Sequence, residues 1–288
     1  MGSFPHATGP WLEPLRQRIR TLIARLPPAL AEFLMFGLKQ AWACLFAAIM
    51  LALLILTHLV WADDWPVSRY DALFVAAIVV QIAFLAFKLE SLDELKVIVL
   101  YHVSGTVMEI FKVRMGSWSY PEPAVFAILG VPLFSGFMYG SVGSFIARTM
   151  RIFDMRFTHY PPVWLTLVLA AAIYLNFFSH HFLPDLRYVL MAATVIVYAR
   201  VSIYFTPDRL TLRMPLVIAA LLTAIFLWLA ENIGTVTGTW IYPSESGWQP
   251  VSLGKFGSWY LLIYVSFVLV TLVIRPVPPG ARTKSSQR

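Results

Sequence analysis

The sequence contains little cysteine and little charge, and each shortage narrows what the chain can be. Its 288 residues include one cysteine, Cys44, so an internal disulfide is excluded and the cysteine count indicates neither an oxidising nor a reducing compartment. Charged residues make up 13% of the chain, whereas hydrophobic residues make up 59%. A soluble domain of that composition would expose large apolar patches to water. The composition therefore predicts an integral membrane protein.

Several motifs that mark common functional sites are also missing. The chain has no phosphate-binding loop, nucleophile elbow, dinucleotide-binding glycine pattern or haem motif. It also lacks the His-x3-His and Glu-x-x-His spacings that place two metal ligands on one helix face. We therefore expect neither a cofactor nor a metal. The net charge is +7, but the basic residues gather near the ends of apolar runs, so membrane topology explains the charge better than nucleic-acid binding does.

Long apolar runs, by contrast, are abundant. A helix needs about 20 predominantly apolar residues to cross a bilayer, and eight runs of this sequence approach or exceed that length. We therefore expect an all-α integral membrane protein in which residues 29–275 form an eight-span membrane domain. The predicted transmembrane helices cover residues 41–61, 70–87, 97–115, 124–146, 163–182, 188–205, 216–233 and 259–274.

The segments on either side of this membrane domain are basic. Within residues 1–28, leucine and isoleucine recur every three or four positions between residues 11 and 26, with arginines between them. This pattern predicts an amphipathic helix that lies on an anionic membrane surface, or one that packs on the cytoplasmic end of the bundle. Residues 276–288 form a basic tail. Most of the 22 lysines and arginines fall in the segments that lie on the same side of the predicted membrane domain as the N-terminus, which predicts cytoplasmic termini and a plasma-membrane (bacterial inner-membrane) location.

One sequence motif occurs twice with identical spacing. Glu109 is followed after six residues by Gly-Ser-Trp-Ser-Tyr-Pro, and Glu231 is followed after six residues by Gly-Thr-Trp-Ile-Tyr-Pro. Other matched residues precede the two copies. The matches predict two four-helix repeats, at about residues 41–146 and 163–274. Because each repeat holds an even number of spans, the repeats should be parallel and related by an axis along the membrane normal.

Glu109 and Glu231 are the main candidate functional residues. An acid within an apolar run is costly to insert, so two acids at matched positions predict a site formed by both repeats. Each acid lies about 10 Å from the outer end of its helix. The acids are candidate general acids or bases, or they tie helices together across the pseudo-axis. Lys112 lies one helical turn after Glu109 and is placed to pair with it.

The remaining candidates lie near these acids or on the same outer side. Aromatic residues of the two motifs form an interfacial belt, or they form the wall of a ligand pocket. His180 and His181 end the fifth predicted span and are candidates for proton transfer, because histidine titrates near neutral pH. The predicted substrate-binding residues are Lys112, Trp118, Tyr120, Asn176, Asn232, Trp240 and Tyr242.

Four stretches of the chain carry a family resemblance. They are the first motif continued to Glu122, Val-Pro-Leu-Phe-Ser-Gly-Phe-Met-Tyr at 131–139, Asn-Phe-Phe-Ser-His-His at 176–181, and Trp-Leu-Ala-Glu-Asn-Ile at 228–233 with the second motif. These stretches resemble the bacterial integral membrane proteins grouped as domain-of-unknown-function family 817, a resemblance that implies no activity. The acid followed by Gly-x-Trp-x-Tyr is also similar to motifs of membrane-embedded carotenoid cyclases and hydratases, although their Pro-x-Glu-Glu signature is absent.

These features lead to competing functional hypotheses. In the first, the protein is an intramembrane enzyme that acts on a lipid or isoprenoid, with Glu109 or Glu231 as general acid or base and His180 or His181 assisting. The cyclase resemblance implies the same class of substrate. In the second, the protein is a small-solute or proton-coupled transporter whose acids bind protons or cations. A third, a membrane scaffold, leaves the buried acids unexplained. The lipid bilayer is the expected partner in every case, and the oligomeric state stays open.

Overall fold

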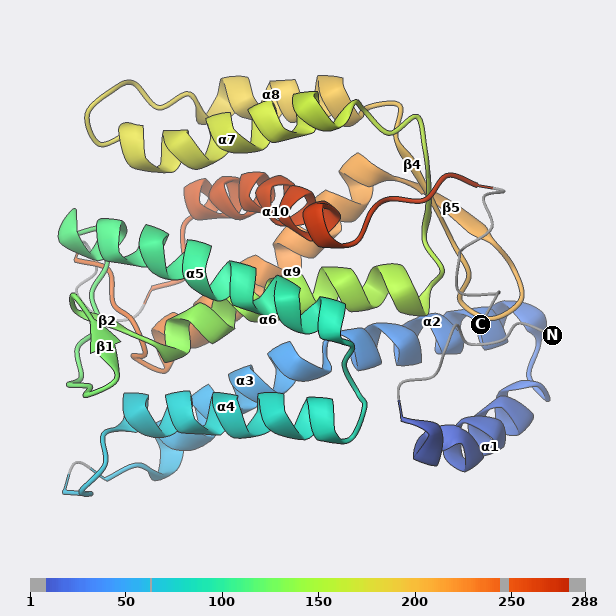
Figure 1. Cartoon of the computed structure of the whole chain (residues 1–288), viewed down its shortest axis with the longest axis horizontal. Coiled ribbons are helices and arrows are strands. Elements are labelled where there is room, and N and C mark those ends of the chain that lie inside the picture. The colour runs from blue at the N-terminus through green and yellow to red at the C-terminus, as the bar shows by residue number, and fades with distance from the viewer. Residues whose placement is uncertain (1–8, 63, 244–248, 280–288) are drawn as a thin grey trace.

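A computed structural model describes residues 9–62, 64–243 and 249–279, and most of these residues are helical (Figure 1). The helices are η1 (Pro10–Leu12), α1 (Glu13–Ile23), α2 (Pro28–Ala43), α3 (Leu45–Val60), α4 (Arg69–Ala86), α5 (Leu92–Arg114), α6 (Phe134–Ile152), α7 (Val163–Ser179), α8 (Arg187–Tyr198), α9 (Leu216–Val236) and α10 (Leu253–Val273).

Two small antiparallel sheets correct the expectation of an all-α chain. The first pairs β1 (Ala127–Ile128) with β2 (Val131–Pro132). The second has the strand order β3–β4–β5 and consists of β3 (Arg156–Thr158), β4 (Ser202–Phe205) and β5 (Leu212–Pro215). Their backbone groups bond to each other, which is how a non-helical segment inside a membrane protein satisfies its polar groups.

The two sheets lie at opposite ends of the helical bundle (Figure 1). Strands β4 and β5 lie at the end that also holds α1 and the last turn of α10, whereas β1 and β2 lie at the other end. The first and last described helices therefore reach the same end of the bundle. This arrangement agrees with an even number of crossings, and the cytoplasmic placement of that end stays a prediction.

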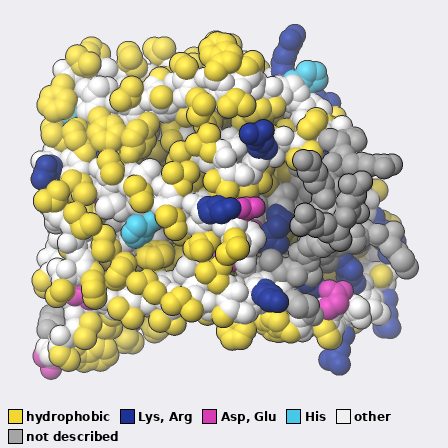
Figure 2. All heavy atoms as spheres, in the orientation of Figure 1, with side chains coloured by type: hydrophobic (Ala, Val, Ile, Leu, Met, Phe, Trp, Pro, Cys, Tyr) yellow, Lys and Arg dark blue, Asp and Glu magenta, His cyan; other side chains and the backbone are white. Residues whose placement is uncertain are grey.

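Some of the helices are long and apolar enough to cross a membrane. Within the described residues these are α4, α9 and α10, and a fourth span results if α2 and α3 are counted as one helix bent by 63° at Cys44. α7 and α8 are apolar but shorter. Hydrophobic side chains cover much of the left and centre of the face in Figure 2, as expected for a surface in contact with lipid. Eight complete spans stay a prediction.

The predicted span at residues 124–146 begins too early. Its first part forms the β1–β2 hairpin, and helix α6 begins only at Phe134. Leu129 and Gly130, between the two strands, have positive φ angles of 52° and 83°. A two-residue type I′ turn requires positive φ at both central positions, and a helix cannot continue through it.

The predicted spans at residues 188–205 and 259–274 also change. α8 ends at Tyr198, and the apolar run that follows forms β4, which pairs with β3 and β5 on its two sides. α10 begins earlier than predicted, at Leu253. Hydropathy alone separates a buried strand from a buried helix poorly, which explains the first of these errors.

The N-terminal segment forms a helix, as its pattern predicts. α1 ends at Ile23, which packs with Ile19 against Ala31 and Met35 of α2. Leu15 and Leu22, beside this contact, are exposed, so an apolar strip of α1 is available to contact a membrane surface. Residues 1–8 of this segment, and residues 280–288 of the predicted basic tail, lie outside the described residues.

Glycines allow α5 and α6 to approach each other closely. A Cβ at Gly136 would lie 2.4 Å from His102 Nδ1, and one at Gly143 would lie 2.7 Å from the ring of Tyr101 and from Val97. Small residues at a helix interface serve this purpose in membrane proteins. The contact holds together the two helices that carry Glu109 and one of its hydrogen-bond donors, Tyr139.

Gly143→Val should lower the stability of the protein. The new side chain would overlap Tyr101 and Val97, and overpacking of this kind costs about 1–3 kcal/mol. The change is measured as a lower melting temperature of the purified protein in detergent. Gly37→Val is the matched control, because a Cβ at Gly37 meets nothing within 4 Å. Equal melting temperatures for the two variants would contradict the prediction.

A buried ion pair joins α6 to the turn between α4 and α5. Arg148 Nη2 lies 3.2 Å from Glu90 Oε1, and both side chains are 0% exposed. Glu90 also accepts hydrogen bonds from Ser144 Oγ, at 2.9 Å, and from Gln81. Arg148 Nη1 lies 3.4 Å from the carbonyl oxygen of Trp42, close to the bend between α2 and α3. The pair and its neighbours therefore tie α2, α4 and α6 to the turn before α5.

Candidate functional site

The first motif folds back onto its own acid. Gly116 has a φ of 68° and reverses the chain after α5. Trp118 Nε1 then lies 2.8 Å from Glu109 Oε2, and the hydroxyl of Tyr120 lies 2.8 Å from the same oxygen. Tyr139 of α6 donates to Glu109 Oε1 at 2.6 Å. A carboxylate has about four acceptor sites, so the buried Glu109 is largely satisfied by these three donors.

The second motif makes the equivalent contacts. Gly238 has a φ of 61° and reverses the chain after α9. Trp240 Nε1 donates to Glu231 Oε1 at 2.9 Å, and the hydroxyl of Tyr242 donates to the same oxygen. In each motif, therefore, the tryptophan and the tyrosine that follow the glycine donate hydrogen bonds, and the glutamate accepts them.

The two motif loops also bond to each other. Ser119 N–H donates to the carbonyl oxygen of Ile241 at 3.0 Å, and Ile241 N–H donates to the carbonyl oxygen of Ser119 at 3.0 Å, as an antiparallel bridge. The ring of Trp118 meets the ring of Tyr242 edge-on, with 6.2 Å between centroids. The two loops thus form one unit that holds both acids.

The start of α4 fastens this unit to the bundle. The buried Arg69 forms an ion pair of 2.6 Å with Glu122, just after the first motif, and its Nη1 donates to the carbonyl oxygen of Thr237 at 3.3 Å. The hydroxyl of Tyr70 donates to the carbonyl oxygen of Thr239 at 2.7 Å. One helix terminus therefore contacts both motifs.

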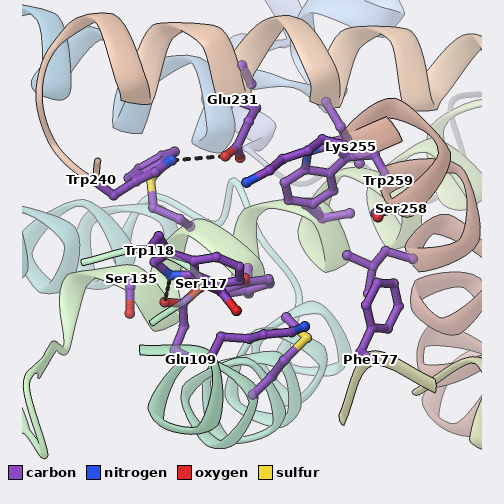
Figure 3. Close-up of a pocket in the computed structure, with 18 of the residues that line it drawn as sticks. Glu109, Ser117, Trp118, Ser135, Phe177, Glu231, Trp240, Lys255, Ser258 and Trp259 are labelled. Carbon is purple, nitrogen blue, oxygen red and sulfur yellow. Dashed lines mark hydrogen bonds between the residues drawn. The ribbon is translucent and has the colours of Figure 1, made fainter. Parts of the chain in front are cut away.

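The two acids line one cavity of about 460 Å³. Glu109 and Glu231 extend toward it from opposite sides, each bonded to the tryptophan of its own motif (Figure 3). Of the other predicted site residues, the cavity is lined by Lys112, Trp118, Tyr120, His180, Trp240 and Tyr242. Phe177 and Trp259 complete an aromatic part of the wall.

The cavity is not lined by Asn176 or Asn232, two of the predicted substrate-binding residues. Asn176 donates to Asp185 Oδ1 at 3.0 Å and accepts from the N–H of Leu186. Asn232 accepts from the N–H of Val251 at 2.9 Å. Both amides fasten the loops that follow their helices, which is a structural role. The sequence could not distinguish it from ligand binding.

Lys112 does not form the predicted pair with Glu109. Its Nζ lies 3.1 Å from His181 Nε2 and 3.4 Å from His180 Nε2, and 5.9 Å from the ring centroid of Phe177. His180 Nδ1 lies 2.9 Å from the carbonyl oxygen of Asn176, so that nitrogen carries the proton and Nε2 accepts from the ammonium group. His181 belongs to this cluster although it does not line the cavity.

Among the groups outside the helices, Tyr120 and Asp185 have shifted pKa values that affect the site. Burial and the nearby carboxylate of Glu109 raise the pKa of Tyr120 well above its ordinary value, so its hydroxyl stays a hydrogen-bond donor. Burial alone would raise the pKa of Asp185, but hydrogen bonds from Asn176 and from the backbone of Arg187 outweigh it and lower that pKa. Asp185 is therefore an ionised partner for Arg187, 2.9 Å away.

Sequence reasoning missed several residues of the site, and two of them contact the motifs directly. Tyr139 lies within a segment that resembles family 817, but its distance of 30 residues from Glu109 gave no local signal. Lys255 belongs to α10, and its Nζ lies 2.7 Å from the ring centroid of Tyr242 and 5.7 Å from that of Trp118. It occupies a cation–π position beside the second motif (Figure 3).

The fold and the site together define a helical membrane protein with a cavity at the end of the bundle where the two motif loops meet. The chain belongs to the family described as "Protein of unknown function (DUF817)", whose profile matches residues 32–267. It is 42% identical over 243 residues to the uncharacterized protein YoaT of Bacillus subtilis (strain 168), covering 84% of this chain and 91% of that protein. The resemblance to family 817 is thereby confirmed.

Two solved structures show a distant likeness. One is a mycobacterial Insig homologue, MvINS from Mycobacterium vanbaalenii, with a TM-score of 0.46 and 15% identity over 65% of this chain and 97% of that one. The other is a cross-linked MvINS trimer, with a TM-score of 0.46 and 16% identity over the same shares of the two chains. None of these matches is a carotenoid cyclase or hydratase, so that resemblance stays a prediction.

Proposed function

We propose that this protein binds a lipid or isoprenoid in the cavity between the two motifs and acts on it as an intramembrane enzyme. The observation that carries the proposal is the cavity itself, because about 460 Å³ is within the usual range of small-molecule sites. Its walls are largely aromatic and aliphatic, and a few polar groups converge on it. That combination suits an apolar chain with one polar head group.

The matched contacts of the two motifs support a duplicated origin for the site. Each glutamate accepts from the tryptophan and tyrosine that follow it at the same spacing. Ser119 and Ile241, which occupy equivalent positions, bond reciprocally to each other. Reciprocal bonding of equivalent residues is what a local two-fold axis between the motifs would produce. We therefore keep the two parallel four-helix repeats as part of the proposal.

The site contains groups suited to proton transfer. Glu231 and His180 line the cavity, and a carboxylate and an imidazole are common general acids and bases. Glu109 accepts three hydrogen bonds, which hold its carboxyl group in one position. In this proposal Glu109 is a fixed hydrogen-bond acceptor at the wall, while Glu231 and His180 are the candidates for moving a proton.

Transport is the second candidate function, because one helix is bent beside the cavity. α2 and α3 meet at 63°, and Ala47 and Leu51, on the first turns of α3, line the cavity. Discontinuous helices next to a binding site are frequent in secondary transporters. Conversion of a bound lipid by the purified protein favours the enzyme, whereas solute uptake into vesicles without chemical change favours transport.

Lipid retained during purification tests the proposal. The full chain is purified in a maltoside detergent, extracted with organic solvent and compared by mass spectrometry with Ser258→Phe, which fills the cavity wall. We expect a lipid or isoprenoid that is abundant with the natural protein and several-fold depleted in the variant. Val79→Phe, at an exposed position of α4, is the control. Identical lipid profiles in all three proteins would overturn the proposal.

A further inference from the structure

The Lys112 ammonium group is buried at the cavity wall with neutral partners. The residue is 5% exposed, and its two close polar neighbours are the Nε2 atoms of His180 and His181. No acidic group of the described residues lies within 4 Å of its Nζ. An ammonium group has three N–H donors, and a buried charge is normally compensated by an opposite one. The arrangement calls for an anion.

The nearest carboxylates already have other partners. Glu109 accepts from Trp118, Tyr120 and Tyr139. Asp185 forms an ion pair with Arg187 at 2.9 Å and accepts from Asn176. Neither carboxylate is placed to compensate Lys112 directly. Because the described residues offer Lys112 no close carboxylate, the negative charge would have to come from a ligand.

Other donors at the same cavity would suit an anion with several oxygens. The cavity is also lined by Arg187, Lys255 and Ser117, and Ser117 Oγ lies 3.4 Å from His181 Nε2 within the Lys112 cluster. A phosphate monoester carries up to two negative charges and offers three acceptor oxygens. Lysine is a common phosphate ligand. The cavity is much larger than a phosphate ion, and most of its remaining wall is apolar.

We infer that the head group bound at Lys112 is a phosphate monoester carried on an apolar chain, with Lys112 donating to its oxygens and His180 and His181 orienting the lysine. The inference rests on the proposed function and adds the chemical class of the ligand. A lipid phosphate and free phosphate share this chemistry, and the apolar walls favour the lipid.

A series of ligands with one chain and different head groups tests the inference. Oleyl phosphate, oleic acid, oleyl alcohol and inorganic phosphate are titrated into the full chain in dodecyl maltoside. The readout is intrinsic tryptophan fluorescence, since Trp118, Trp240 and Trp259 line the cavity. The natural protein should bind oleyl phosphate about tenfold or more tighter than oleyl alcohol. Lys112→Met should lose that preference, and Lys112→Arg should keep most of it.

Lys96→Met is the matched control, because Lys96 is exposed on the same helix and pairs with Asp93 at 2.8 Å. It should keep the full preference for oleyl phosphate. If Lys112→Met does not fold, the comparison of ligands on the natural protein still decides the question.

Each contrary outcome has a different meaning. Equal affinity for oleyl phosphate and oleyl alcohol overturns the inference and leaves the proposed lipid site standing. Oleic acid binding as tightly as oleyl phosphate overturns the phosphate assignment, and inorganic phosphate binding as tightly overturns the lipid source. If no oleyl compound binds, the proposed function fails together with the inference.

Discussion

Arg148→Met is expected to lower the free energy of unfolding by about 3–5 kcal/mol, because removing one partner of a buried ion pair leaves the other charge uncompensated. Arg148 and Glu90 are both fully buried, and the hydrogen bonds from Ser144 and Gln81 hold Glu90 in place. Glu90 cannot turn toward water without breaking these bonds. The loss is measured by thermal or denaturant unfolding in detergent.

Two further variants separate the charge effect from the loss of packing. Arg148→Met combined with Glu90→Met removes both charges, and replacing a whole buried pair by apolar side chains is often neutral or stabilising. The double variant should therefore be more stable than Arg148→Met alone. Lys96→Met breaks an exposed pair with Asp93 and should cost less than about 1 kcal/mol. A double variant less stable than the single one would contradict the explanation.

The residues within each motif could be identified from the sequence, but not their bonds. The identical spacing of the two motifs predicted a site formed by both acids and left the aromatic residues open between an interfacial belt and a pocket wall. The structure joins Glu109 to Trp118 and Tyr120, and Glu231 to Trp240 and Tyr242. A glycine reverses the chain in both copies. Contacts within about ten residues follow from helix length and turn geometry, which a sequence pattern contains.

The contacts of the site between residues far apart in the sequence could not be predicted in this way. The bond from Tyr139 to Glu109 and the contacts of Lys112 with the two histidines depend on how α6 and α7 pack against α5. Lys112 and Glu109 satisfied the local rule for an i,i+3 pair, but each has partners from other helices. Tertiary packing overrode a weak local preference.

One difference between the motifs has a steric explanation. The position equivalent to Lys112 in the second copy is Gly234, and a Cβ there would lie 2.0 Å from the ring of Trp240. The ring of Trp240 occupies that space, so a lysine could not be accommodated. The sequence showed that the copies differ at this position, but only the packing shows why.

The sequence predicted a helical membrane protein better than it predicted the bounds of the individual spans. The apolar runs identified the helices around α4, α9 and α10, which are long enough to cross a bilayer. Errors occurred where an apolar segment is extended, as in β4, or turns sharply, as at Leu129 and Gly130. Hydropathy measures burial in lipid or protein and does not depend on the backbone conformation.

Glu109→Met is expected to lower the free energy of unfolding by at least about 3 kcal/mol, because it removes the acceptor of three buried donors and each unsatisfied buried group costs about 1–3 kcal/mol. The donors belong to Trp118, Tyr120 and Tyr139. The loss should also disorder the first motif and weaken lipid retention. The melting temperature in detergent and the retained lipid are the two measurements.

Removing donors as well as the acceptor tests this reason. Glu109→Met combined with Tyr120→Phe and Tyr139→Phe leaves only the Trp118 N–H without an acceptor, so the triple variant should recover part of the stability that Glu109→Met loses. Glu109→Gln keeps one acceptor oxygen and should lose the least. If Glu109→Gln melts like the natural protein but no longer converts a bound lipid, Glu109 is a proton carrier and its assignment as a fixed hydrogen-bond acceptor is wrong. If it keeps both stability and conversion, the negative charge is dispensable and the hydrogen bonds alone shape the site.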